Sequence, residues 1–238
     1  MLKKILIAFI ALALPLLLVV TSIRVIASDW FIHFEYSRPD FPPDQFGFTL
    51  EQRTPLALIG MQSVLPDSQG IVLLERATLP DGSPAFNERE IGHMTDVRVL
   101  ISKVYPIELI GLALIVILAV LLNRSIHWRD AVPNGLLLGS ILTLAILGML
   151  IAYIFVNFDS FFLQFHQLFF QGTTFMFLFT DTLIRLYPVQ FWSDAAITIG
   201  AMTTVCALFL LIGSIWWLRR LKKANVIASK ARQSLDRI

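Results

Sequence analysis

The sequence predicts an α-helical integral membrane protein with four transmembrane helices and a small mixed α/β extracytoplasmic cap. The chain of 238 residues is 56% hydrophobic and only 15% charged, whereas soluble domains are about 45–50% apolar and about 25% charged. The apolar residues gather in four blocks of roughly the 20 residues that span a bilayer. The charged residues collect between these blocks and at the end of the chain, which excludes an ordinary soluble domain.

The four apolar blocks predict the transmembrane helices. They cover residues 5–23, 106–122, 135–156 and 195–218. The first block follows two lysines, as in a secretory signal peptide, but its apolar run exceeds the usual length of about 7–15 residues. An uncleaved helix is therefore favoured over a cleaved one.

Basic residues predict the orientation of these helices. Lys3 and Lys4, the loop after the second block, and seven lysines and arginines in the tail 219–238 fall on one side if all four blocks span. Cytoplasmic flanks are rich in lysine and arginine, so both termini are predicted to be cytoplasmic. The tail is expected to meet anionic membrane lipid and not nucleic acid, because basic residues beside a membrane helix favour lipid headgroups.

Two segments then lie on the opposite side. Residues 28–105 carry eleven acidic and six basic residues and form the expected cap. The expected organisation is a first transmembrane helix (1–27), the cap (28–105), transmembrane helices two and three with a short cytoplasmic loop (106–156), a Phe-rich extracytoplasmic or interfacial segment (157–194), a fourth transmembrane helix (195–218) and a basic cytoplasmic tail (219–238).

The cap sequence predicts both strands and helices. Aromatic and β-branched residues in 29–36 favour a strand, and 70–86 favour two strands around a Pro-Asp-Gly-Ser turn. Thr54 and Pro55 resemble the N-cap and first residue of a short helix. Asn87 and Glu90 resemble a capping box at the start of a helix over 88–104, which leads into the second apolar block.

The Phe-rich segment predicts an amphipathic helix. Phenylalanines recur in it at three- and four-residue spacing, which aligns them on one helical face; these are Phe158, Phe161, Phe162, Phe165 and Phe169. Such an aromatic helix is typical of a membrane interface or a lipid-facing groove.

Two histidines are candidates for chemistry. On a helix, Glu90 and Asp96 each lie three positions from His93, so a carboxylate there could orient the imidazole and raise its basicity. His166 is a polar ring among phenylalanines and needs a partner if it is buried. A solvated helix face at His93 and a structural carbonyl cap at His166 are the alternatives.

Other chemistries have weaker support. The sequence has no His-Glu-x-x-His, Gly-x-Ser-x-Gly, Walker or Gly-x-Gly-x-x-Gly motif, and the single cysteine, Cys206, has no cysteine partner for a metal cluster. Two alternatives to the reading given below stay open. One is a membrane metallohydrolase that uses His33, His93 and His166, and the other is a non-enzymatic membrane assembly or binding protein.

Three stretches of the chain resemble the bacterial lipoprotein intramolecular transacylase family. They are "FPPDQFGFTLEQR", "EREIGHMTDVRVL", and "FHQLFF" together with "DTLIRLYPVQFW". The resemblance implies four spanning helices, an outer cap and residence in the bacterial cytoplasmic membrane. It also implies transfer of the sn-2 acyl chain of a diacylglyceryl-cysteine lipoprotein to the cysteine α-amine, with the lyso-form lipoprotein as the product.

The resemblance maps the two family histidines onto His93 and His166 as the catalytic pair. Ester-to-amide transfer is downhill, so no cofactor or metal is expected. We expect His93 to be the base because of its carboxylate neighbours. The candidate oxyanion-stabilising or supporting residues are Glu90, Asp96, Arg89, Arg98 and Arg185, and the candidate acyl-groove residues are Phe162, Phe165, Phe169 and Phe170.

Overall fold

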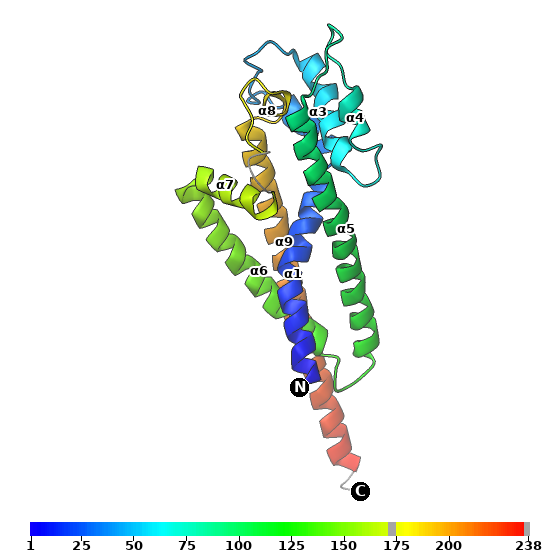
Figure 1. Ribbon diagram of the computed structural model, residues 1–238. Helices are drawn as coiled ribbons and strands as arrows, with labels where there is room; N and C mark the ends of the chain where they lie inside the picture. Colours follow the sequence, from blue (N-terminus) through cyan, green and yellow to red (C-terminus); the bar gives the residue numbers. More distant parts are fainter. Residues whose placement is uncertain (171–174, 236–238) are drawn as a thin grey trace. The chain divides into compact units, whose positions relative to one another are not determined.

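The computed structural model describes residues 1–170 and 175–235, and its regular elements in that part of the chain are α-helices (Figure 1). Pro106 does not interrupt the fifth helix, which continues from the charged sequence into the apolar one. The helices are α1 (Leu2–Ile26), α2 (Asp29–Ser37), α3 (Leu50–Val64), α4 (Val72–Arg76), α5 (Glu88–Asn123), α6 (Ala131–Val156), α7 (Phe158–Phe169), α8 (Thr182–Leu186) and α9 (Val189–Leu235).

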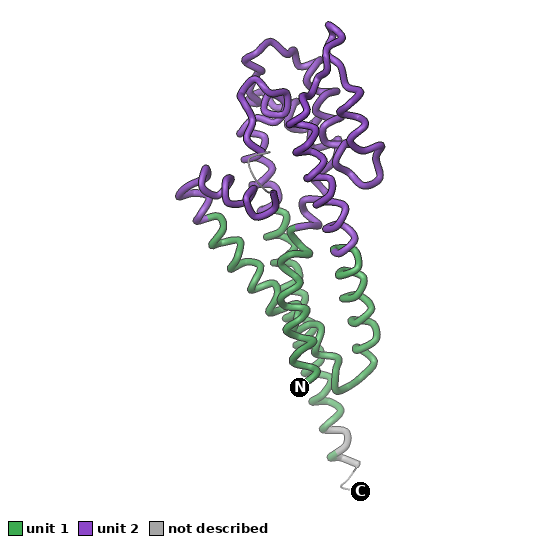
Figure 2. Tube along the Cα trace, viewed as in Figure 1, with its two compact units in different colours: residues 1–19, 108–151, 201–238 green, residues 20–107, 152–200 purple. Residues whose placement is uncertain are grey.

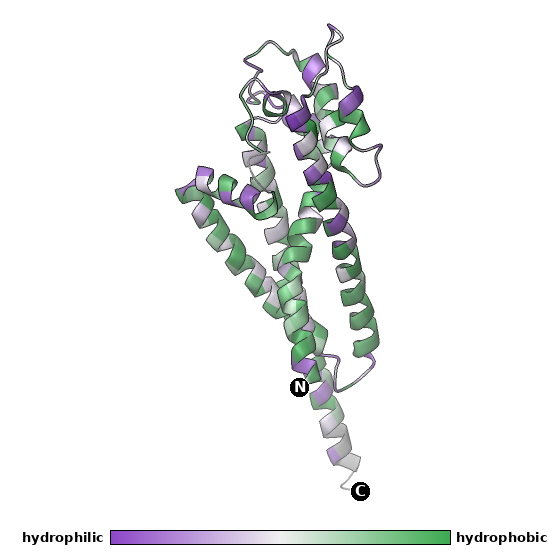
Figure 3. Cartoon of the chain, viewed as in Figure 1, coloured by the Kyte–Doolittle hydropathy of each residue, from purple (hydrophilic) through white to green (hydrophobic). Residues whose placement is uncertain are grey.

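Four of these helices are long and apolar enough to cross a membrane. Helices α1, α5, α6 and α9 contain windows with mean hydropathy of 2.8, 2.6, 2.4 and 2.3. Figure 3 shows hydrophobic residues along α6 and the later part of α5, and hydrophilic residues at the start of α5. The predicted number of membrane helices therefore agrees with the structure.

The chain divides into two compact units (Figure 2). Unit 1 comprises residues 1–19, 108–151 and 201–238, and unit 2 comprises residues 20–107 and 152–200.

Unit 1 is held by close helix packing at small residues. A Cβ atom added at Gly135 would lie 2.7 Å from the Cβ of Ile10, and one added at Gly139 would lie 2.8 Å from the Cβ of Leu14. The absence of these side chains lets α1 and α6 approach closely, as is common between membrane helices. Beside this contact, a buried cluster joins α1 to α9; its members are Leu14, Leu18 and Ala207, with Leu136, Leu144 and Leu210 packed against them.

The prediction of a mixed α/β cap is wrong for the described residues, because unit 2 contains no strand there. Residues 29–36 form α2, whose buried side chains are Phe31, Ile32, Glu35 and Tyr36. This spacing places them on one helical face. Short aromatic runs are ambiguous between strand and helix, and contact with the rest of unit 2 decided this one.

The prediction of two strands in residues 70–86 is also wrong. The first half of this segment is the short helix α4, and only an isolated antiparallel bridge between Thr78 and Pro84 remains of the pairing. Gly82 at this turn has a φ of +83°, which favours glycine. The hairpin turn was thus identified correctly, but too few residues pair around it to make strands.

Two helix starts were predicted from caps, with different outcomes. Helix α3 begins five residues before the predicted site, because Thr49 and Gln52 form its capping box. At α5 the predicted box is present: the Glu90 backbone N–H donates to Asn87 Oδ1 (3.1 Å), and the Asn87 N–H donates to Glu90 Oε2 (2.8 Å).

Candidate active site

The first turns of α5 position His93. The capping box fixes the start of the helix, and Glu90 Oε1 also accepts the backbone N–H of Leu183 (2.7 Å). Glu90 is thus buried with both oxygens bonded to backbone groups. One helical turn later, the side chain of His93 faces inward and is only 8% exposed. The helix start is therefore anchored just before the candidate catalytic residue.

Helix α7 positions His166. Asn157 caps the helix by accepting the backbone N–H of Ser160 (2.9 Å), and the predicted phenylalanine face follows. His166 lies in the last turn and is partly buried. Phe162, one turn earlier, stacks against it with ring centroids 4.0 Å apart.

The two histidines lie together in unit 2. Their ring centroids are 6.3 Å apart and the ring planes differ by 29°. Phe170 lies against both, at 5.1 Å from the ring of His93 and 5.9 Å from that of His166. The rings of Phe175 and Phe177 complete these surroundings, at 5.0 Å from His166 and 5.4 Å from His93 respectively. Two titratable rings therefore share an aromatic environment.

A hydrogen bond assigns the tautomer of His166. Its Nδ1 lies 2.7 Å from the carbonyl oxygen of Phe162. A carbonyl only accepts, so Nδ1 carries the proton and Nε2 of the neutral ring holds the lone pair. Burial lowers the pKa of His166 below its usual 6.5, against an opposing effect of this hydrogen bond. The ring is therefore neutral near pH 7, with Nε2 available as a proton acceptor.

His93 has a buried nitrogen with no partner. Within the described residues, no hydrogen bond reaches Nδ1. His93 lies in the charged part of α5, ahead of the apolar stretch that starts at Pro106. Burial lowers the pKa of His93 to about 4, helped by His166 and opposed by Asp96. Unsatisfied buried polar atoms are rare and costly, and this one lies where a reactive group is expected.

The prediction that a carboxylate holds His93 by a hydrogen bond is wrong for the described residues. Both oxygens of Glu90 are bonded to backbone N–H groups, and Asp96 is exposed. The three-residue spacing does place these side chains near one face of α5, but burial turns Glu90 towards α8. The carboxylate argument for His93 as the base is therefore removed.

The three candidate arginines have different partners. Arg98 donates to the carbonyl oxygens of Ser63 (3.0 Å) and Leu65 (2.5 Å). Arg185 forms a two-point ion pair with Asp44 (3.1 and 2.9 Å).

Arg89 is connected to the histidine pair through Phe177. Its guanidinium carbon lies 5.8 Å from the ring centroid of Phe177, which contacts His93. Its side chain is also 44% exposed and therefore accessible.

Asp181 is a site residue that the sequence analysis missed. This buried carboxylate accepts from Asn87 Nδ2 (3.0 Å), Arg89 Nη2 (2.7 Å) and the backbone N–H of Leu178 (2.7 Å). It joins the start of α5 to the segment that carries Phe177. Its only sequence signal is its place before α8, and a lone aspartate before a helix predicts no long-range partner.

The predicted acyl-groove residues divide by exposure. Phe170 is buried against both histidines, and Phe162 is half-buried against His166. Phe165 and Phe169 are both 45% exposed and stack on each other with centroids 5.1 Å apart. Phe175 and Phe177 were not predicted as part of the site.

The three-histidine metal site is not formed by the described residues. His33 is exposed on α2, and no group of three or more histidine, cysteine, aspartate or glutamate side chains in the described part of the chain is arranged to hold a metal. The arrangement instead suits proton transfer between two imidazoles and a bound substrate.

Comparison with known proteins identifies the relatives of this chain. The family "Lipoprotein intramolecular transacylase Lit" matches residues 8–192. An uncharacterized protein of Aquifex aeolicus (strain VF5) is 32% identical over 216 residues, which cover 90% of this chain and 94% of that protein.

Solved structures share the fold. The membrane integral lipoprotein intramolecular transacylase Lit from Bacillus cereus superposes with a TM-score of 0.77 at 19% identity, over 93% of this chain and 98% of that one. A histidine-to-arginine variant of the same protein gives a TM-score of 0.67 at 17% identity, over 94% and 95% of the two chains.

Proposed function

Because the chain belongs to the lipoprotein intramolecular transacylase family, we propose that it moves an acyl chain within one lipoprotein molecule in the bacterial cell membrane. The substrate bears a diacylglyceryl group on the sulfur of its N-terminal cysteine. The sn-2 ester carbonyl passes from the glycerol oxygen to the cysteine α-amine, giving an amide and a lyso-glyceryl group. The observation that carries this proposal is the stacked pair of His93 and His166 in an aromatic environment.

His166 is the proposed base. Its hydrogen bond to Phe162 leaves Nε2 as a proton acceptor, and its lowered pKa keeps the ring neutral near pH 7. The α-amine nitrogen attacks the ester carbonyl carbon as Nε2 takes an amine proton. When the C–O bond breaks, the imidazolium returns a proton to the glycerol oxygen. One proton thus passes from nitrogen to oxygen, and the ring ends neutral.

His93 is proposed to assist the same step as a neutral ring. With a pKa of about 4 it is not an imidazolium near pH 7, so it is not the first source of the proton. Its neutral ring carries one N–H and one lone pair. The N–H can donate to the oxyanion that forms at the carbonyl, an interaction that stabilises such transition states. Arg89 is the proposed second donor to this oxyanion.

The aromatic residues are proposed to hold the lipid. Phe162 and Phe170 lie against the histidines, and the exposed Phe165 and Phe169 extend the same face of α7. An apolar surface beside the reacting ester holds the acyl chain and excludes water, which would hydrolyse the ester. Holding the amine and the ester together can lower the activation free energy by about 7–11 kcal/mol.

The proposed membrane arrangement follows the charge pattern. The termini and the loop after α5 are basic and face the cytoplasm, and the segments 28–105 and 157–194 lie on the outer side. Both histidines belong to these outer segments, where a lipoprotein carries its lipid anchor.

Mass spectrometry of lipoprotein N-termini tests the proposal. Cells that carry the parental protein should convert the diacylglyceryl form of a reporter lipoprotein to the N-acylated lyso form. His93→Ala and His166→Ala should each abolish most of this conversion, while the variant proteins still accumulate in the membrane.

The matched control is His33→Ala, which removes an exposed histidine from α2 of the same unit. It should leave conversion unchanged. Full conversion by His166→Ala would disprove the proposed base. Loss of conversion in His33→Ala as severe as in the other two would favour the three-histidine metal site.

A further inference from the structure

A basic recess lies in unit 1, which does not contain the histidine pair. Its volume is about 430 Å³. Three parts of the chain build it: the start of α1, the connection between α5 and α6, and α9. The lining residues used below are Lys3, Ile126, Arg129, Leu218, Leu221 and Lys222.

The recess has an excess of positive charge. Lys3, Arg129 and Lys222 line it, against the single carboxylate of Asp130. Asp130 is paired with Lys3 at 2.5 Å, and Arg129 donates to the amide oxygen of Asn225. One acid cannot neutralise three cations, so the recess suits an anion.

Apolar side chains share the same lining. Ile126 is 60% exposed, and Leu218 and Leu221 lie beside the cations on α9. A small soluble anion would gain nothing from these leucines, whereas a lipid carries acyl chains that cover them. The combination of cations and leucines therefore suits an amphiphile.

The recess also lies near a marker of the membrane interface. On α9, Trp216 is 56% exposed, and the guanidinium carbon of Arg220 lies 3.8 Å from the centroid of its ring. Exposed tryptophans gather at the headgroup level of membranes, and the lining residues Leu218, Leu221 and Lys222 follow within two helical turns.

We propose that this recess binds the phosphate headgroup of an anionic phospholipid, with Arg129 and Lys222 as its ligands. The lipid acyl chains lie against Leu218 and Leu221. The binding joins two separate segments of unit 1, the α5–α6 connection and α9, through one ligand. It requires no catalysis, so it stands or falls independently of the transacylase proposal.

Titration of the purified full-length protein with mixed micelles tests the site, with tryptophan fluorescence as the readout. Phosphatidylglycerol should bind at least about tenfold more tightly than phosphatidylcholine, because each surface cation favours an anionic lipid by about 1 kcal/mol, or about fivefold. Inorganic phosphate distinguishes the two sources of phosphate. If free phosphate competes at concentrations similar to those of the lipid, the lipid assignment is wrong.

The decisive variant is Lys222→Ser, with Lys223→Ser as its matched control. Lys223 is the next residue of the same helix, is also exposed, and does not line the recess. Lys222→Ser should weaken phosphatidylglycerol binding by more than about fivefold, and Lys223→Ser should weaken it clearly less. Equal losses would show only a diffuse positive surface and would overturn the site.

Arg129→Gln supplies a second variant. Glutamine removes the charge but keeps a side-chain donor for Asn225, so the local packing is retained. It should weaken phosphatidylglycerol binding as Lys222→Ser does, with an unchanged circular dichroism spectrum. Parental affinity in both variants would rule out the proposed ligands.

Discussion

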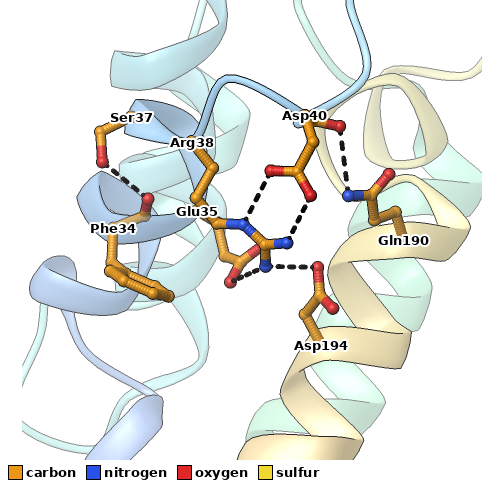
Figure 4. A network of polar contacts seen from close by, with 7 residues as sticks. All are labelled: Phe34, Glu35, Ser37, Arg38, Asp40, Gln190 and Asp194. Carbon is orange, nitrogen blue, oxygen red and sulfur yellow. Dashed lines mark hydrogen bonds and ion pairs between the residues drawn. The ribbon is translucent and has the colours of Figure 1, made fainter.

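Two groups of polar side chains in unit 2 differ in how many of their atoms have a hydrogen-bond or ion-pair partner. At the histidine pair, aromatic rings surround His93 and His166, and one buried nitrogen has no partner among the described residues. At the second group, which we call the Arg38 network (Glu35, Arg38, Asp40 and Asp194), the partly exposed guanidinium pairs with three carboxylates (Figure 4).

The Arg38 network connects α2 to α9. Arg38 forms a two-point pair with Asp40, with Nε and Nη2 donating over 3.1 and 2.7 Å. Its Nη1 donates to Asp194 over 2.8 Å and to the fully buried Glu35 over 3.4 Å. Gln190 on α9 adds a bond to the Asp40 carbonyl oxygen. Such planar, shared pairing is typical of a structural arginine.

The difference indicates which group is structural and which is reactive. A network whose donors and acceptors are all paired has few left to bind a substrate. Removing one member leaves a charge without its partner. A buried imidazole nitrogen without a hydrogen-bond partner reduces the stability of the free protein. The same nitrogen can form a hydrogen bond with a bound substrate. The four predictions below test this distinction, in order of decreasing expected effect.

The largest expected effect is that of His93→Phe. It replaces the unpartnered ring by an apolar ring in an aromatic environment. We expect transacylation to fall by about 10²–10⁴-fold and the free energy of unfolding to rise by about 1 kcal/mol, because a buried unsatisfied nitrogen is removed. Reporter conversion by mass spectrometry and thermal unfolding in detergent measure the two effects. A variant that is less stable yet still active would contradict the distinction.

The second prediction is the opposite outcome at Arg38. Arg38→Ala leaves three neighbouring carboxylates without their cation, one of them the fully buried Glu35, so we expect the free energy of unfolding to fall at pH 7. The activity of the protein that stays folded should be nearly unchanged. Arg76→Ala, at an exposed arginine of α4, is the control and should change neither quantity.

The pH dependence of the Arg38→Ala variant has a defined sign. Burial, followed by the Asp194 carboxylate, raises the pKa of Glu35 above 4.5, whereas Arg38 lowers it. Without Arg38 this pKa rises further, so the folded state binds protons more readily than the unfolded state. The stability deficit of Arg38→Ala should therefore shrink as the pH falls through this raised pKa. A deficit that is constant with pH would argue against charge repulsion as its cause.

The third prediction concerns Asp181. Its carboxylate accepts three hydrogen bonds and joins Arg89 to the segment that carries Phe177, which contacts His93. Asp181→Asn weakens the bond to Arg89 and the support of Phe177, so we expect kcat to fall by about tenfold, or about 1.4 kcal/mol, with little change in KM. Asp67→Asn, at an exposed aspartate, is the control. A change in KM alone would indicate a role in substrate binding instead of positioning.

The smallest expected effect is a shift in the pH profile. The pKa of His166 is lowered by burial, so the active neutral form persists below pH 6.5 and the acid limb of kcat/KM should lie below that value. Phe175→Ala exposes the ring of His166 to water and should move the limb upward, towards 6.5. An acid limb above 6.5 in the parental protein would contradict His166 as a buried neutral base.

Part of the fold and site follows from the sequence because the signals are local. The four apolar helices reflect hydropathy summed over about 20 residues, and the Asn87–Glu90 capping box involves residues three apart. The aromatic face of α7 repeats with the helical period. His93 and His166 were selected by their neighbours in the sequence and by the family resemblance. None of these features needs a contact between distant segments.

Only the tertiary structure decided the remaining features. Residues 29–36 are a helix because the rest of unit 2 covers one helical face of them, whereas the run itself is too short to exclude a strand. Glu90 turns away from His93 because the backbone N–H of Leu183 is brought within 2.7 Å of it. Asp181 meets Asn87 and Arg89 across more than 90 positions of the chain, and such encounters depend on burial and packing that no local pattern encodes.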